Sequence, residues 1–229
     1  MREDGIEFDR IIISADENFD PYEEGITPPQ ESEVMVSTCE GSNFVFFAST
    51  TDVVNIEAEH YSSCDLGEDN NGHQWLEVEH ENSSGGTHLL AYPDLATNYK
   101  DNLSGPRLSY NIFLPESGTY HAWISIRPNS YGNDTIGLTW GNNSTSGEMT
   151  VINSFSWKSK GQWEWEPQNA PRIPINITTD SSGITTLTIW MREDGIEFDR
   201  IIISADENFD PYEEGITPPQ ESEVMVSTC

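Results

Sequence analysis

Three tryptophans, Trp157, Trp163 and Trp165, lie within nine residues of sequence and could bind a sugar. Sugars bind to proteins through their CH faces, which lie on exposed aromatic rings while polar side chains fix the hydroxyl groups. Trp163 and Trp165 alternate with acidic residues, and this period of two favours a place in the core for that pair. Trp157, at the end of an expected strand, is the better surface candidate for carbohydrate binding, with Tyr92 and Trp75 as candidate partners.

A second group of candidate functional residues is acidic. Glu57 and Glu59 alternate with Ile56 and Ala58 in the stretch VVNIEAEHY, and the period of two predicts a half-buried strand. Carboxylate oxygens are the ligands that hard cations such as Ca²⁺ prefer. Two interpretations stay open: the pair of glutamates helps to hold a metal ion, or it only lines the solvent face of the strand.

Patterns typical of catalysis are weak in this sequence. Carboxylates are abundant, so a pair at the separation used by glycosidases can arise by chance. The sequence contains no Gly-x-Ser-x-Gly elbow. A zinc site needs closer spacing or softer ligands than the scattered histidines offer. We therefore do not expect an enzyme. The histidines are His60, His73, His80, His88 and His121.

Short apolar runs, separated by clusters of Gly, Asn, Pro and Asp, fill the chain from Val53 to about Ala205. Their spacing is typical of an all-β protein, and no stretch carries a convincing helical stripe. The sequence predicts an antiparallel β-sandwich of eight or more strands. The expected strands are 53–61, 87–92, 107–114, 118–128, 134–140, 151–157, 171–177, 185–191 and 198–203.

The two ends of the chain are identical. Residues 1–39 and 191–229 are the same thirty-nine letters, which gives a period of 190 residues. This length is that of a whole domain with its linker. The simplest interpretation is one unit of a tandem array, and the alternative is a cloning artefact. Met1 is the periodic image of Met191 and need not be a start codon, so we expect the natural beginning of the protein to lie upstream.

Charge excludes some partners. Forty acidic residues against ten basic ones give a net charge of −30. Binding to phosphate backbones requires Lys and Arg, so we expect no nucleic acid partner. Anionic membrane surfaces are equally unsuitable, and no apolar run is long enough to insert into a bilayer. An acidic surface suits a calcium-bearing medium and keeps long polymers apart and soluble.

The repeat explains why the chain has an odd number of cysteines, three in all. Cys229 is the periodic image of Cys39, so each unit has two cysteines. We expect a disulfide between Cys39 and Cys64, and the competing pairing is Cys64 with Cys229. Six Asn-x-Ser/Thr sequences are candidates for glycosylation and, with the disulfide, favour an extracellular or cell-surface location. They begin at Asn82, Asn102, Asn133, Asn142, Asn143 and Asn176.

Four stretches occur in a familiar order: NIEAEHY, SGPRLSYNIFLPESGTYHAWI, SFSWKSKGQWEWEPQ and GITTLTIWMREDGIEFDRIII. In this order they resemble the jelly-roll carbohydrate-binding modules of families six and thirty-five. The sequence is most similar to a related module at the C-terminus of some glucuronidases and in tandem-repeat bacterial surface proteins, where WMREDG before an Asp and a hydrophobic strand recurs. The likeness covers about Val53 to Ser204 and implies a jelly-roll β-sandwich.

The resemblance also implies a ligand set. Modules of this type hold a structural calcium ion through the alternating acids of the first strand and an Asp of the last strand. Here these residues are Glu57, Glu59 and Asp199, with backbone carbonyls near Gly85 or Gly86. Converging carboxylates repel one another unless a cation lies among them. Sugar-binding relatives usually have an Asn two residues before that Asp, and Glu197 in this sequence departs from their pattern.

In such modules the FDRIII strand is the last one and pairs beside the first, which sets the expected boundaries. Residues 1–13 are then the last strand of the preceding repeat, and 14–50 are an acidic, proline-bearing linker with an entry strand. Residues 51–205 form the sandwich, and 206–229 lead toward the next repeat. Unpaired, the strand at 1–13 could add to the edge of a neighbour's sheet.

Two functions follow as hypotheses. The main one is a structural repeat unit of a secreted tandem-repeat fibre or surface adhesin, stabilised by calcium, carrying N-linked glycans and contacting neighbouring copies of the same repeat. Identical units suit a linear assembly, because every junction reuses the same complementary surfaces. The alternative is a lectin-like carbohydrate-binding module that binds polysaccharide through multivalency.

Overall fold

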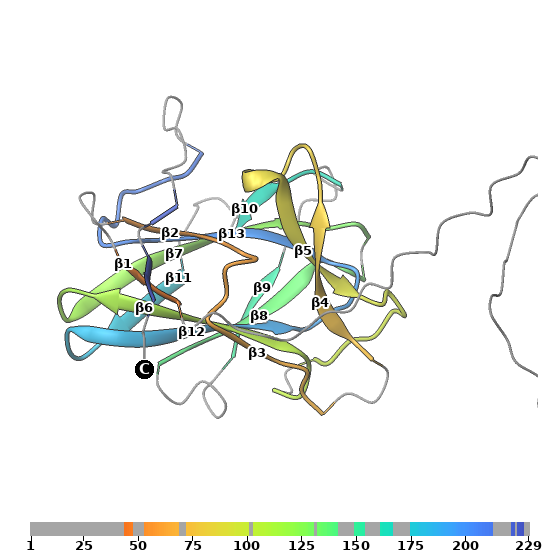
Figure 1. Cartoon of the computed structure of the whole chain (residues 1–229), viewed down its shortest axis with the longest axis horizontal. Coiled ribbons are helices and arrows are strands. Elements are labelled where there is room, and N and C mark those ends of the chain that lie inside the picture. The colour runs from red at the N-terminus through yellow and green to blue at the C-terminus, as the bar shows by residue number, and fades with distance from the viewer. Residues whose placement is uncertain are drawn as a thin grey trace, which may run out of the picture. The chain divides into compact units, whose positions relative to one another are not determined.

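The computed structural model describes residues 44–47, 53–68, 72–100, 103–130, 132–141, 149–153, 161–166, 175–212, 221–222 and 224–226 (Figure 1). The chain divides into residues 1–35 and 36–229, and every described residue belongs to the second unit. The strand expected at 1–13 and most of the linker expected at 14–50 therefore lie outside the described residues.

The described strands form two seven-stranded sheets (Figure 1). The first sheet has the order β14 (Val224–Val226), β1 (Phe44–Phe47), β6 (Arg107–Leu114), β12 (Gly183–Met191), β8 (Thr135–Trp140) and β9 (Thr150–Asn153), and β3 (Ser63–Asp65) also pairs with β6. Strand β1 runs parallel to β6. The other pairings of this sheet are antiparallel.

The second sheet carries most of the polar residues considered below. Its order is β10 (Glu164–Glu166), β7 (Gly118–Arg127), β13 (Glu197–Ser204), β5 (Thr87–Tyr92) and β4 (Gln74–Glu79), with β11 (Ile175–Thr179) beside β7 and β2 (Val53–Glu57) beside β13. All its pairings are antiparallel. A short 3₁₀ turn, η1 (Ser84–Gly86), connects β4 to β5. Within the described ranges, no helix is long and apolar enough to cross a membrane.

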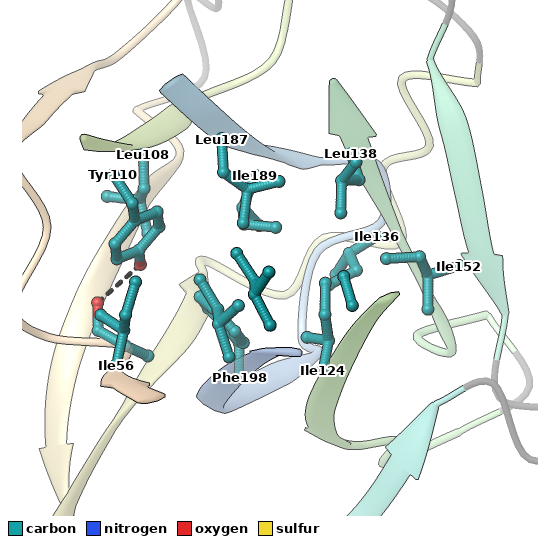
Figure 2. Close-up of a cluster of buried hydrophobic side chains, with 14 of the residues drawn as sticks. Ile56, Leu108, Tyr110, Ile124, Ile136, Leu138, Ile152, Leu187, Ile189 and Phe198 are labelled. Atoms are coloured by element: carbon teal, nitrogen blue, oxygen red, sulfur yellow. Dashed lines mark hydrogen bonds between the residues drawn. The ribbon is translucent and has the colours of Figure 1, made fainter. Parts of the chain in front are cut away.

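The core lies between the two sheets, because each sheet turns an apolar face toward the other. Along β6, buried residues such as Leu108 and Tyr110 alternate with more exposed ones, as a strand with one buried face requires. Figure 2 shows these two side chains opposite Ile56 and Phe198 of the second sheet. The hydroxyl group of Tyr110 donates a hydrogen bond to the carbonyl oxygen of Ala58 at 2.7 Å, so this buried polar group is satisfied.

Strand β13 is the centre of the second sheet and is buried on both faces. All eight of its residues are buried. It pairs with β7 on one side, and on the other side with β5 up to Phe198 and with β2 from Arg200 onward. The register with β7 shifts between Phe198 and Arg200, so Asp199 is the extra residue of a β-bulge. Bulges redirect side chains and interrupt pairing, and here the bulge coincides with the change of partner from β5 to β2.

The all-β jelly-roll-like sandwich that the sequence predicts is confirmed, and β5 and β6 have the predicted bounds. The described sandwich also extends past the expected range 51–205, because β1 and β14 join the first sheet.

Strand β2 is more buried than its alternating sequence predicts. Its last four residues are all buried, including Asn55 and Glu57. The reason is that Ser222 covers this strand: its N–H donates to the carbonyl oxygen of Asn55 at 2.8 Å, and its hydroxyl oxygen accepts from the N–H of Asn55 at 2.9 Å. The polar face of β2 therefore faces a later segment of the chain instead of solvent.

Candidate functional site

Polar and aromatic side chains from across the second sheet converge near the start of β13. They come from the ends of β7 and β13, from β5, and from the residues that follow β4 and precede β10. The pairing of β13 with both β7 and β5 brings these elements together although they are far apart in sequence. We call this group the Glu197 cluster; it consists of Glu197, Arg127, Asn129, His80, His88 and Trp163.

The carboxylate of Glu197 lies at the centre of this cluster and is 8% exposed. Its Oε2 accepts a hydrogen bond from Nε of Arg127 at 2.5 Å and lies 3.1 Å from Nε2 of His88. Its Oε1 accepts from the side-chain amide of Asn129 at 2.8 Å. Burial alone would raise the pKa of Glu197, but the hydrogen bonds from these three neighbours outweigh burial and lower the pKa to about 2. The carboxylate is ionised at neutral pH and is neutralised by groups of the chain itself.

The indole ring of Trp163 is half-buried against the same cluster. The guanidinium carbon of Arg127 lies 5.4 Å from the ring centroid, a cation–π contact. The rings of His88 and His80 meet the indole edge to face, with centroids 5.2 and 6.4 Å away. The expectation that Trp163 and Trp165 belong to the core is therefore wrong. Both are half-buried and outside the core cluster, because β10 is a three-residue strand that pairs only with β7 among the described strands.

Two atoms of the Glu197 cluster are buried and have no hydrogen-bond partner among the described residues: Nε1 of Trp163 and Nδ1 of His88. The indole nitrogen can only donate. When Nε2 of His88 carries the proton toward Glu197, Nδ1 is an acceptor. A donor and an acceptor beside an aromatic ring suit a sugar hydroxyl group, which can both donate and accept.

A second group lies where the pairing partner of β13 changes from β5 to β2. We call it the Glu57 cluster. It consists of Glu57, Glu59, Asp199, Ser84 and Thr87. Ser84 links two of the carboxylates: its N–H donates to Oδ1 of Asp199 at 3.0 Å, and its hydroxyl donates to Oε1 of Glu57 at 2.8 Å. Thr87 donates to Oε1 of Glu59 at 2.5 Å. The three acids expected to bind calcium thus lie in one neighbourhood.

The carboxylates of this cluster are poorly neutralised. Burial is the main cause that raises the pKa of Glu57 and of Glu59. Burial, and then the charge of Glu57, raises the pKa of Asp199 to about 7. Arg200 offers partial compensation, with its Nε 3.4 Å from Oε1 of Glu57. Because Glu57 is buried, the interpretation that it lines the solvent face of a strand is wrong.

The residues of the Glu57 cluster fit a hard cation in their chemistry. Oε2 of Glu57 and Oε2 of Glu59 are buried without a hydrogen-bond partner in the described part of the chain. Gly85 has a φ of +65°, and a Cβ there would lie 3.5 Å from Oε1 of Glu59, so backbone approaches the carboxylate closely. As the side chains lie, no three His, Cys, Asp or Glu residues among those described are grouped tightly enough to hold a metal. A bound ion would therefore draw the carboxylates inward.

The aromatic partners expected for Trp157 do not form a platform. Trp75 is 6% exposed and meets Phe198 edge to face in the core, so its ring face is not available to a sugar. Tyr92 is 44% exposed at the end of β5. Strand register places Trp75 opposite Ala91 and Tyr92 opposite Gln74, so the two rings point to opposite faces of the sheet. Trp157 itself lies outside the described residues.

The other expected sites are the six glycosylation candidates and the disulfide, and only some of their residues are described. Asn133 is 4% exposed and donates to Asp94 at 3.0 Å, so the expectation of a glycan there is wrong. Asn82 and Asn176 are exposed, whereas Asn102, Asn142 and Asn143 lie outside the described residues. Cys64 is disulfide-bonded. Both of its candidate partners, Cys39 and Cys229, lie outside the described ranges, so the pairing with Cys39 stays a prediction.

Sequence reasoning missed the roles of Arg127, Asn129, His80 and His88. One signal was available in the stretch GIEFDRIII, where Glu197, Asp199 and Arg200 interrupt a run that is otherwise apolar. Charged residues on a central strand need partners, because an unpaired buried charge is costly. Nothing in the sequence pattern says which distant residues provide those partners.

Comparisons with known proteins find a relative by sequence and similar solved structures. Uncharacterized protein P23 of Formosa agariphila is 27% identical over 169 residues, which are 66% of this chain and 39% of that protein. The chain thus spans well under half the length of this relative. Among solved structures, a family 35 carbohydrate binding module from Clostridium thermocellum is similar at 15% identity and a TM-score of 0.45, over 66% of this chain and 98% of that one.

A second similar structure is carbohydrate binding module CBM6cm-2 from Cellvibrio mixtus lichenase 5A, in complex with cellotriose. Its identity is 18% and its TM-score 0.42, over 67% of this chain and 97% of that one. The model of a protein family described as the glycosyl hydrolase family 115 C-terminal domain matches residues 46–214, which is most of the chain. The match includes both the Glu197 cluster and the Glu57 cluster. The chain therefore belongs to the family of the glycosyl hydrolase family 115 C-terminal domain.

Proposed function

We propose that this domain is a non-catalytic carbohydrate-binding module and that it binds its ligand at the Glu197 cluster. The family favours this function, our alternative hypothesis from the sequence, over a purely structural repeat unit. The observation that carries the proposal is the half-buried indole of Trp163 next to His88. Among the described residues, neither Nε1 of Trp163 nor Nδ1 of His88 has a hydrogen-bond partner.

The charges of the cluster indicate the class of ligand. Arg127 and Glu197 neutralise one another, so the site offers no excess positive charge to a carboxylate or sulfate group. The whole chain has a net charge of −30, which repels acidic polysaccharides. The ligand that fits is a neutral polysaccharide, with a ring face on the indole and hydroxyl groups on the two unpaired nitrogens.

We further propose that the Glu57 cluster binds a structural calcium ion. Glu57, Glu59 and Asp199 would hold it, with backbone oxygen near Gly85. The ion would supply the positive charge that Arg200 provides only in part, and it would fix the junction of β2, β5 and β13. The Glu197 cluster begins two residues earlier on β13, so this junction also positions the proposed sugar site.

The test uses the full chain on an array of neutral and acidic oligosaccharides, followed by calorimetry on the best ligand. Trp163→Ala is expected to weaken binding about fivefold or more, because an aromatic contact contributes about 1 kcal/mol beyond buried area. Trp165→Ala is the matched control, since that half-buried ring belongs to neither the core nor the cluster. Equal losses in both folded variants, or no binding to any neutral oligosaccharide, would contradict the proposal.

A second candidate function rests on the repeated thirty-nine residues. Tandem copies of such a module in a secreted fibre or surface adhesin would present many weak sugar sites at once and raise avidity. This version places the protein outside the cell, with neighbouring copies as partners. Electron microscopy of the native assembly tests this function, and isolated single domains without ordered neighbours would contradict it.

A further inference from the structure

The repeated segment has a defined place in the fold. Its C-terminal copy, residues 191–229, provides the last residue of β12, all of β13, residues 221–222 and all of β14. Strand β13 is the central strand of the second sheet, and β14 is the first strand of the other. We call the positions that this copy occupies in the two sheets the seat. Without an occupant in the seat, the second sheet would lose the strand that pairs with β7, β5 and β2.

The contacts that hold the segment come from side chains within the segment itself. Phe198, Ile201 and Ile203 enter the core. Asp194, whose side chain is fully buried, accepts hydrogen bonds from the N–H groups of Leu95 at 2.7 Å and of Thr97 at 2.9 Å. The N-terminal copy has the same side chains in the same order, from Asp4 and Phe8 to Ile11 and Ile13. Apart from the disulfide bond of Cys64, which can hold only one of Cys39 and Cys229, the noncovalent side-chain contacts do not distinguish the two copies.

The connections of the chain also allow either copy to reach the seat. Strand β14 lies antiparallel to β1, with Val226 opposite Phe44. In the N-terminal copy the counterpart of Val226 is Val36, and the seven residues 37–43 separate it from Phe44. Seven residues are enough to close an antiparallel hairpin. The C-terminal copy enters the seat from β12, and the N-terminal copy would enter it from the hairpin with β1.

We propose that the seat accepts either copy, so that residues 1–39 can replace residues 191–229 and complete a circularly permuted form of the same sandwich. The peptide bonds of the chain stay the same in both forms, but in the permuted form the sandwich would contain residues 1–190, and β12 would be discontinuous after Trp190. Cys64 can be bonded to only one of Cys39 and Cys229, so the exchange and its tests apply to the reduced chain. The occupant is the copy in the same chain, because a tether of seven residues gives an effective concentration in the millimolar range. This proposal rests on the repeat and is independent of carbohydrate binding.

The consequence is redundancy in a structural element that a sandwich cannot do without. A domain flanked by two copies keeps its central strand when either copy is damaged, cleaved or pulled out. Because the seat holds one copy at a time, the other copy would be available to pair with another strand.

The experiment uses three variants of the full chain: Ile201→Asp, its counterpart Ile11→Asp, and the double variant. Ile201 is fully buried in the core, so an aspartate there is incompatible with docking of that copy. Both single variants are expected to stay folded and monomeric, with cooperative thermal unfolding, and the double variant is expected to be unfolded. An unfolded Ile201→Asp variant overturns the proposal. A variant that folds only as a dimer also overturns it, because the occupant would then come from a second chain.

Hydrogen exchange provides a second readout in the same Ile201→Asp variant. The substitution gives the two copies different masses, so their peptides can be followed separately. Residues 6–13 should gain protection by about a hundredfold or more, whereas residues 196–203 should lose it, since central strands exchange only through global unfolding. Continued protection of residues 196–203 in that variant would overturn the proposal even if the chain stays folded.

Discussion

Two carboxylates of one strand, Glu197 and Asp199, have opposite electrostatic environments. Both belong to β13 and both are at least nine-tenths buried. Burial raises the pKa of Glu197, but hydrogen bonds from His88, Arg127 and Asn129 outweigh burial and lower the pKa to about 2. Burial and the charge of Glu57 raise the pKa of Asp199 to about 7.

The difference shows what the fold does with buried charge. At the Glu197 cluster, β7 and β5 provide the donors, so the charge is compensated within the chain. At the Glu57 cluster, the bulge at Asp199 turns a carboxylate toward two more acids of β2 and the residues that follow it. A buried group of like charges is stable only with protons or with a cation. The charge of Glu197 is balanced within the chain, whereas that of the Glu57 cluster is balanced only in part, by Arg200.

The largest effect is expected from Arg127→Ala. This change leaves the ionised carboxylate of Glu197 buried without its main partner, which should lower the free energy of unfolding by about 3–5 kcal/mol. The matched control is Arg107→Ala. Arg107 also lies over a tryptophan, 4.9 Å from the ring centroid of Trp190, but its ion-pair partner Asp65 is 47% exposed. Its loss should cost about 1 kcal/mol or less through the ion pair.

Urea unfolding at pH 7 measures both variants. Equal destabilisation by the two substitutions would show that Glu197 is no better neutralised by its arginine than an exposed aspartate is. The contrast between the two clusters would then have no energetic basis at the Glu197 cluster.

Calcium should stabilise the protein through the Glu57 cluster alone. At a concentration one hundred times its Kd, an ion that binds only the folded state raises the free energy of unfolding by about 2.7 kcal/mol. Glu59→Gln should remove most of this gain, because it takes from the ligand set a carboxylate whose Oε2 is buried without a hydrogen-bond partner among the described residues. Glu79→Gln on the exposed edge of β4 should leave the gain unchanged. Thermal melts with calcium and with a chelator measure the effect, and an equal gain in Glu59→Gln would exclude the site.

The sequence could predict the sandwich because strand periodicity is a local property. β5 and β6 alternate or run apolar within their own residues, and turn residues mark their ends. The proximity of Glu57, Glu59 and Asp199 could also be predicted from the sequence. The family resemblance pairs the first strand with the last, and the structure pairs β2 with β13.

The Glu197 cluster could not be predicted, because it depends on sheet order. Its residues come from five separate segments, and only the order β10-β7-β13-β5-β4 brings them together. The burial of individual side chains could not be predicted from the sequence either. Trp75 and Glu77 are two residues apart on β4 and therefore lie on the same face of the strand. Glu77 is exposed, but Trp75 is buried. Asn133 has the sequence of a glycosylation site, but that motif carries no information on its contact with Asp94.

The last expected effect is on pH dependence, and its sign differs between the two carboxylates. The pKa of Glu197 is lower in the folded chain than its ordinary value of 4.5, so its stabilisation is present above pH 4.5 and is lost as the pH falls toward 2. The pKa of Asp199 is higher in the folded chain than its ordinary value of 3.8. Its contribution is therefore present below about pH 4 and is lost as the pH rises through 7.

Calcium-free unfolding curves between pH 4 and pH 8 isolate the second of these contributions. The variant Asp9→Asn/Asp199→Asn changes both copies of the repeated segment, so that neither copy brings the carboxylate back. It should lose less stability than the parent as the pH rises from 4 to 8, because an amide does not ionise. Saturating calcium should abolish the difference in slope, since a bound cation holds Asp199 ionised across this range. A parent whose calcium-free stability rises over the same range would mean that Asp199 is compensated as well as Glu197 is.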